Sequence, residues 1–151
     1  MNPFAEIRDA IAKRIRSLQV VSNPPGDYGG AIPVLSFQAH KLESKLKESI
    51  QSVGISVVVR EKGFSYNDRQ ALARFEVTIW EKPIDNHSKL GASLDGLSLA
   101  FNICATLEQF EPSDQWSAIH NLDASEPSVN EKGLLVTTIT MQTVGYFRGR
   151  S

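Results

Sequence analysis

A strictly alternating segment at residues 72–80 constrains the fold of this chain more than any other feature. Apolar residues occupy every second position there: Ala73, Phe75, Val77 and Ile79. Because successive side chains of a strand point to opposite faces, the pattern predicts a β-strand with one buried and one wet face. A run rich in β-branched residues at 55–60 predicts an antiparallel neighbour. The segment 63–68 between them has turn chemistry at both ends, and we expect an exposed hairpin tip there.

Three segments carry the spacing of three or four that marks the buried stripe of a helix. The first follows Asn2, which can cap it, and runs to residue 18. The second covers 39–53. The third follows Ser93, which can cap it in turn. The buried face of this third helix is expected to contain Leu97, Ala100, Cys104 and Leu107, with Phe101 and Phe110 widening it.

The remaining segments complete an α+β pattern. Residues 116–122 and 134–144 predict two further strands, Val20 and Val21 predict the start of a short one, and proline and glycine predict a loop at 23–30. A chain of 151 residues removes roughly two-thirds of its extended-chain surface from water when it folds. We therefore expect one domain over 1–151, with a mainly antiparallel sheet of about four strands against about three helices.

Charge and composition exclude several classes of function. Sixteen basic and seventeen acidic residues give a formal net charge of -1, which lacks the excess of positive charge that nucleic-acid binding requires. The basic groupings, Lys13 with Arg14 and Arg16 and the C-terminal 148–150, are expected to be solvated. One cysteine, no signal-peptide pattern and no apolar run of about 18 residues predict a cytoplasmic protein without membrane contact.

Candidate chemical groups are better explained as structure. His40, His87 and His120 lack partners at metal-ligand spacing, and Cys104 on an apolar helix face predicts an inert thiol with a raised pKa. We therefore expect no catalytic residue, no metal and no cofactor, and hence no enzyme. One alternative stays open, an enzymatic or ligand-binding site assembled from dispersed residues such as His87, His120 and Asp123.

Five residues are candidates for an oligomer or partner interface. Trp80 lies in register with Arg74 and Glu76 on the polar face of its strand, where water is expected. Phe64 and Tyr66 are aromatic residues inside the predicted hairpin tip. Such residues anchor subunit contacts, but a helix covering that end of the sheet explains Trp80 equally well.

Taken along most of its length, the chain resembles the tail-terminator, or tail-completion, proteins of tailed phages and prophages, including a Mu-like group. The segments that carry the resemblance are the Asn2-Pro3-Phe4 helix, the strands at 54–60 and 74–80, and the helix at 92–110 before a final pair of strands. The resemblance implies a non-enzymatic structural subunit. It would form a ring, commonly hexameric, that caps the head-proximal end of the tail tube and stops its polymerisation.

The partners implied by this resemblance are other copies of the chain, the tail tube protein and the head-completion proteins. The protein would be found in the host bacterial cytoplasm during assembly and then in the virion tail. Segment 63–68 or the loop 23–30 would contact the tube. A second alternative is an adaptor protein unrelated to phage, with one apolar surface patch.

Overall fold

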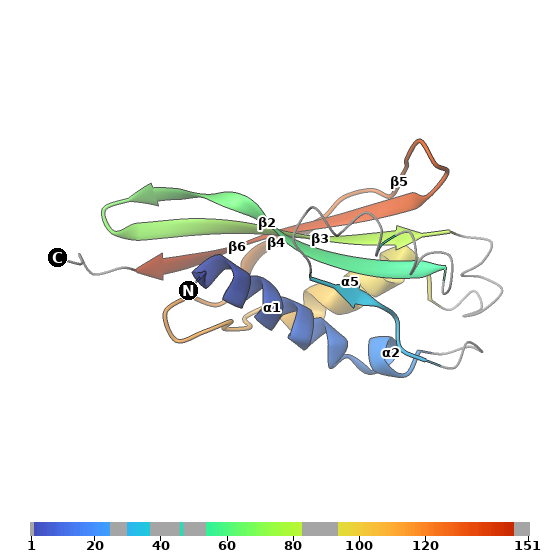
Figure 1. Ribbon diagram of the computed structural model, residues 1–151, viewed down its shortest axis with the longest axis horizontal. Helices are drawn as coiled ribbons and strands as arrows, with labels where there is room; N and C mark the ends of the chain where they lie inside the picture. Colours follow the sequence, from blue (N-terminus) through green and yellow to red (C-terminus); the bar gives the residue numbers. More distant parts are fainter. Residues whose placement is uncertain (1, 25–29, 37–45, 47–53, 83–93, 147–151) are drawn as a thin grey trace.

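A mixed sheet with helices packed on one of its faces forms the frame of the molecule (Figure 1). The computed structural model describes residues 2–24, 30–36, 46, 54–82 and 94–146. Within these residues the elements follow one another as α1 (Pro3–Arg16), α2 (Gln19–Ser22), β1 (Val34–Leu35), β2 (Ile55–Asn67), β3 (Gln70–Glu81), α5 (Gly96–Leu107), β4 (His120–Ala124), β5 (Ser128–Val129) and β6 (Leu135–Tyr146). The expected α+β class is confirmed.

The sheet has more strands than the sequence predicted, and it is mixed. Six strands appear among the described residues instead of about four, in the order β1-β2-β3-β6-β4, with β5 also paired to β6. All pairs are antiparallel except β1 with β2, where Val34 lies beside Val57. Strands β1 and β5 have two residues each, too few for the alternation that reveals a strand in sequence.

The predicted hairpin tip at 63–68 was wrong in its boundaries. Strand β2 continues through 63–67, and the chain turns at Asp68 and Arg69 alone. Both turn residues have positive φ, 51° and 63°, as a two-residue turn of type I′ requires. A bulge where the register shifts between Glu61 and Gly63 divides the long hairpin into two halves.

The predicted alternation of β3 is confirmed on the face that the helices cover. Ala73, Phe75, Val77 and Ile79 are all buried. Helices α1 and α5 pack against this face and against each other. The largest fully buried side chains come from these helices and from three strands: Ile7, Ile11, Ile15, Leu99, Ile103, Leu107, Ile55, Phe75, Ile79, Ile139 and Met141. One continuous core therefore lies between the sheet and the helices.

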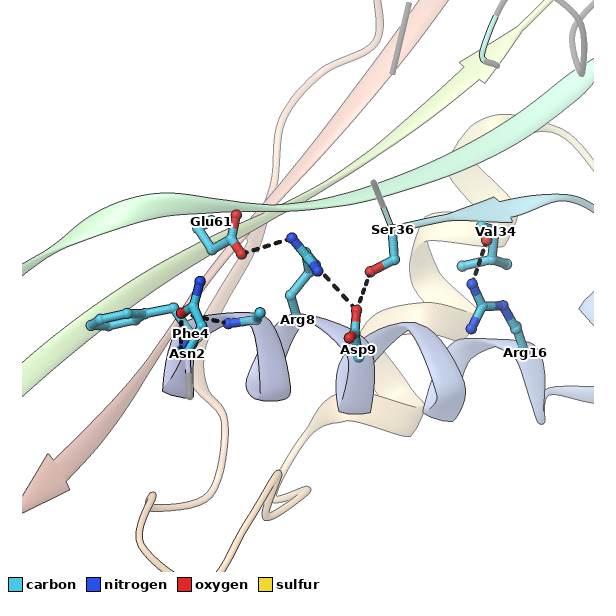
Figure 2. Close-up of polar contacts among 9 residues, drawn as sticks. Asn2, Phe4, Arg8, Asp9, Arg16, Val34, Ser36 and Glu61 are labelled. Atoms are coloured by element: carbon cyan, nitrogen blue, oxygen red, sulfur yellow. Dashed lines mark hydrogen bonds and ion pairs between the residues drawn. The ribbon is translucent and has the colours of Figure 1, made fainter. Parts of the chain in front are cut away.

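Helix α1 begins as the sequence predicts, because the Asn2 side chain accepts hydrogen bonds from the backbone amides of Phe4 and Ala5. Polar contacts then fix the helix against the sheet (Figure 2). Arg8 donates to Glu61 of β2 at 3.1 Å, and Arg16 donates to the Val34 carbonyl of β1 at 2.7 Å. The long basic side chains thus hold the edge of the sheet to the helix.

The basic grouping on α1 is exposed, as expected, and two of its three side chains also make contacts within the molecule. Arg16 is bound to β1. Arg14 donates to the Thr106 carbonyl at 3.3 Å and lies over the Phe110 ring, 5.1 Å from its centroid. Two of the three exposed side chains are therefore held by contacts within the molecule, through backbone acceptors and a cation–π contact.

Helix α5 starts later than predicted, and a different set of its residues faces the core. Asp95 caps it by accepting from the Ser98 amide at 2.7 Å, whereas Ser93 lies outside the described residues. The buried carboxylate of Glu81 accepts from the Gly96 amide at 3.0 Å, where the positive end of the helix dipole favours negative charge. The residues buried along the helix are Gly96, Leu99, Ala100, Ile103 and Leu107. The expectations that Leu97 and Phe101 belong to the buried face are therefore wrong.

The structure corrects the predicted boundaries or type of several other segments. Val20 and Val21 belong to the short helix α2 and not to a strand. The strand predicted at 116–122 begins only at His120, and Trp116 makes isolated bridges to Ser113 and Gly145. The strand predicted at 134–144 is confirmed as β6. The helix at 39–53 and most of the 23–30 loop lie outside the described residues, apart from a helical residue at 46.

Candidate interaction surfaces

The far half of the β2–β3 hairpin, residues 62–74, extends beyond the helices and is called the arm below (Figure 1). Phe64 and Tyr66 lie on it with exposed fractions of 51% and 58%. They face the same side of the sheet as the helices, because they lie opposite the buried Ala73 and Ala71. Phe64 also stacks on Phe4 of α1, with ring centroids 5.0 Å apart. The arm therefore presents aromatic surface with a fixed base.

The other three candidate residues lie on the opposite face. Arg74 donates to the Ser65 hydroxyl at 3.0 Å. Glu76 is buried and forms an ion pair with Arg60 at 2.6 Å. Trp80 is half-buried, and its indole N–H donates to the Thr78 hydroxyl at 2.8 Å. The structure thus divides the five predicted residues between two faces instead of bringing them together.

The sheet face that carries Trp80 is not exposed to solvent along its whole length. Ser56, Val58, Glu76 and Thr78 are buried there. The expectation of a solvated second face is therefore wrong at this end of the sheet. Of the two explanations for Trp80, burial against the molecule's own structure is the one that the surrounding burial favours.

An open groove of about 540 Å³ runs between α5 and the loop and strand that follow it. Its lining comes from the helix and from the segment entering β4: Phe101, Cys104, Ala105, Glu108, Gln109, Ile119, His120, Asn121 and Leu122. Phe101 at the groove and Leu97, one turn earlier on α5, are 75% and 52% exposed. Of the residues that the sequence assigned to the core face of α5, Leu97 and Phe101 are therefore exposed, whereas Ala100 and Leu107 are buried.

The structure describes two of the three residues proposed for a dispersed chemical site, His120 and Asp123, both on β4. His87 lies outside the described residues. His120 is partly buried, with Nδ1 3.2 Å from the Ala118 carbonyl oxygen. Burial, and then the negative charge of Asp123, raise the pKa of the Cys104 thiol, in agreement with the expected inert cysteine. In the described part of the chain, no three side chains of His, Cys, Asp or Glu are grouped to hold a metal ion.

Charge is strongly segregated along the chain, although its net value is close to zero. Residues 94–131, which include α5, β4 and β5, contain no lysine or arginine. They contain seven acidic residues: Asp95, Glu108, Glu111, Asp114, Asp123, Glu126 and Glu131. The arm carries Lys62, Arg69 and Arg74 against one acid, Asp68. This signal was present in the sequence, and the whole-chain charge concealed it.

Comparison with family models and with curated proteins found no match to this chain. Within the ranges that the structure describes, no helix combines the length and apolarity needed to cross a bilayer. Functional interpretation therefore depends on the surfaces themselves and on the resemblance noted from sequence.

Proposed function

We propose that this chain is a structural subunit of a phage or prophage tail, which assembles as a ring on the head-proximal end of the tail tube. In that position it would end polymerisation of the tube and present a surface for head-completion proteins. The proposal combines the resemblance to tail-terminator proteins with one structural observation. That observation is the presence of two unlike exposed surfaces, the arm and the α5–β4 groove, on one subunit.

Two unlike surfaces suit a ring because head-to-tail contacts use a different patch on each side of the interface. Strand β4 ends the sheet on one side, whereas the arm is built from β2 and β3 nearer the other side. A contact between such patches repeats from subunit to subunit and closes when the rotation allows. A self-complementary patch would instead favour a dimer, as expected for the alternative of a simple adaptor.

The proposal also fits a role without chemistry. Among the described residues, His120 and Cys104 are partly buried, Glu81 and Asp95 accept from backbone amides at the start of α5, and Glu76 is paired with Arg60. A protein that acts by shape needs rigid elements with exposed contact residues. The arm supplies them, with aromatic side chains on a strand pair anchored in the core.

The test is to add purified protein, labelled for electron microscopy, to tail tubes assembled from the tube protein of the same phage. The expected result is label at a single end of each tube and no further growth from that end. The protein alone should give ring particles of about six subunits by light scattering and negative-stain imaging at high concentration. Uniform label along the tube wall, or growth that continues from labelled ends, would overturn the proposal.

A further inference from the structure

The outer side of the arm is an unpaired strand edge. Strand β2 is paired with β3 on one side, and on the other side the two-residue strand β1 reaches only Val57 and Val58. Beyond these two positions, no other strand of the described residues lies along β2, and Figure 1 shows it as the outer strand of the arm. Such an edge offers backbone donors and acceptors that can pair with another chain.

The two-residue turn determines which backbone groups of β2 point outward. Asn67, the last residue of β2, flanks this turn and therefore forms a hydrogen-bonded pair with β3. Hydrogen-bonded and non-hydrogen-bonded pairs alternate along an antiparallel ladder, so Ser65 also directs its backbone groups toward β3. The backbone N–H and C=O groups of Phe64 and Tyr66 lie at the alternate positions and point away from β3. The outer edge thus combines these backbone groups with two exposed aromatic side chains.

Segment 63–67 has none of the features that usually protect an edge strand. Charged side chains, proline and bulges are the common protections. In the arm, the bulge and Lys62 lie at the base, before this segment begins. Residues 63–67 contain no charge and no proline, and all five are exposed. Another strand can therefore pair there without burying a charge.

The same segment of a second copy provides a matched partner strand. Antiparallel pairing centred on Ser65 places Phe64 of each copy opposite Tyr66 of the other. Both positions point outward, so the two residues of each pair can exchange both backbone hydrogen bonds. Positions 64 and 66 also lie on the same face of the sheet, so each pair brings two aromatic side chains together. A shift by one residue would place an outward-pointing position opposite an inward-pointing one and lose these bonds.

We propose that two copies of the chain pair through segment 63–67 of their arms, antiparallel about Ser65, so that the two sheets become one. The bodies of the two copies then lie at opposite ends of the paired arms, because the strands run in opposite directions. Lys62 comes next to Asp68 of the second copy in this register, so the charges that flank the pairing are unlike. Only five residues of each copy pair, and such a small interface gives a weak dimer.

The side chain of Arg74 gives this contact a distinctive dependence on salt. Arg74 donates to the hydroxyl of Ser65 in its own chain at 3.0 Å, so pairing brings two guanidinium groups toward the axis between the copies. Salt screens this repulsion between like charges. Association is therefore expected to strengthen as the salt concentration rises, whereas a contact held by ion pairs would weaken.

This inference goes beyond the proposed function and does not rest on it. The edge of the arm is self-complementary, whereas ring closure would use unlike surfaces. Pairing occupies the edge and leaves the α5–β4 groove exposed. The contact therefore joins two copies without closing a ring.

A disulfide across the axis tests the register. Residues of a non-hydrogen-bonded antiparallel pair have Cα atoms about 4.5 Å apart, which a disulfide can span. Ser65→Cys, in a Cys104→Ala background, is therefore expected to form a covalent dimer with oxidised glutathione. Asn67→Cys is the matched control, since it is exposed on the same face and its two copies would lie roughly 13 Å apart along the strands.

Non-reducing gels measure the rate of this cross-linking. The Ser65→Cys variant is expected to cross-link at least about tenfold faster than the Asn67→Cys variant, because only its sulfur atoms come within bonding reach. Equal rates, or no dimer from Ser65→Cys, would overturn the proposed pairing.

Sedimentation velocity over a concentration series measures association without a cross-link. The wild type is expected to show a weak monomer–dimer step. Ser65→Lys places two further cations opposite each other and should raise the dimer Kd at least about tenfold. Gln19→Lys, the same charge change at an exposed position on α2, should leave the Kd unchanged. Circular dichroism checks that both variants fold.

Two results in sedimentation would contradict the contact. One is a wild type that stays monomeric at every concentration, and the other is a Ser65→Lys variant that dimerises as well as Gln19→Lys. The proposed function is tested separately. A cross-linked pair in a protein that never caps tubes would leave the contact and remove the function, in favour of the adaptor alternative. Tube capping by a chain that fails both tests of pairing would do the reverse.

Discussion

The two halves of the β2–β3 hairpin share one strand pair and differ in almost everything else. In the inner half, 55–61 with 75–81, α1 and α5 cover one face, and most residues of the opposite face are buried as well. In the arm, every residue from 62 to 69 is exposed. The bulge between Glu61 and Gly63 marks the boundary. The comparison shows that one continuous ladder can form part of the core at one end and exposed surface at the other.

Two phenylalanines provide the largest test of this division. Phe75 is fully buried under the helices, and Phe64 is half-exposed on the arm. Phe75→Ala is expected to lower the free energy of unfolding by about 3–5 kcal/mol, since it leaves a cavity in the core. Phe64→Ala, the matched control, should cost about 1 kcal/mol, mainly the stacking on Phe4. Urea unfolding measures both, and equal losses would remove the distinction between the halves.

Strand β6 beside Ala71, in the outer part of the arm, should be sensitive to a single methyl group. A Cβ added at Gly145 would lie 2.8 Å from the Trp116 ring, which packs directly on this glycine of β6. Gly145→Ala is therefore expected to destabilise the protein by about 1–3 kcal/mol through overpacking. Gly30→Ala is the control, because a Cβ there meets no atom within 4 Å. Thermal unfolding that shows no difference between the two variants would contradict the packing.

The caps of the two covering helices offer a test by pH. Backbone hydrogen bonding from the Ser98 amide holds the pKa of Asp95 below its usual value, so its stabilising effect is present above pH 3.8 and is lost as the pH falls through the lowered pKa of the folded state. Asp95→Ala should cost about 1 kcal/mol at pH 7.

Asn2 caps α1 without titrating, so the cost of Asn2→Ala is expected to stay constant with pH. The cost of Asp95→Ala should instead diminish below about pH 4, where the wild-type carboxylate becomes protonated. Urea unfolding at pH 7 and at low pH, for both variants against the wild type, measures the difference. A cost at Asp95 that does not change with pH would show that the cap does not depend on charge.

The smallest expected effect is a gain in stability from a substitution at the tip of the arm. Arg69 has a φ of 63°, a conformation that glycine adopts without cost and other residues do not. Arg69→Gly is expected to raise the free energy of unfolding by about 0.5–1 kcal/mol, since the turn then has the Asp-Gly sequence that type I′ favours. Arg69→Ala, which keeps the Cβ, should give no gain. A gain in both variants would point to the lost charge as the cause.

Local sequence determined the elements whose periodicity or capping is complete within one segment. The alternation at 72–80, the Asn2 cap with its stripe of isoleucines, and the long strand ending the chain were all predicted and are present. These features arise from the side-chain periods of strands and helices and from hydrogen bonds that span three residues. No partner from another part of the chain is needed to specify them.

Tertiary structure decided which apolar groups are buried and which strands pair. Helix α5 has apolar residues around most of its circumference, so only packing on the sheet selects Leu99 and Ile103 for the core and leaves Phe101 exposed. The two-residue strands β1 and β5 exist because β2 and β6 offer free edges to them. The position of the turn at Asp68 and Arg69 follows from the register of β2 with β3. Neither residue is a glycine, so the sequence has no residue there that would predict the turn.

The candidate surfaces were accessible to sequence only in part. Phe64 and Tyr66 were selected as aromatics in a polar segment, and the structure exposes both. The acidic stretch at 94–131 can be counted from the sequence, but its meaning depends on the groove that folding forms beside Phe101. Sequence thus determined the local elements and the charges of each segment. Folding determined which of these charges share a surface, because that depends on contacts between residues far apart in the chain.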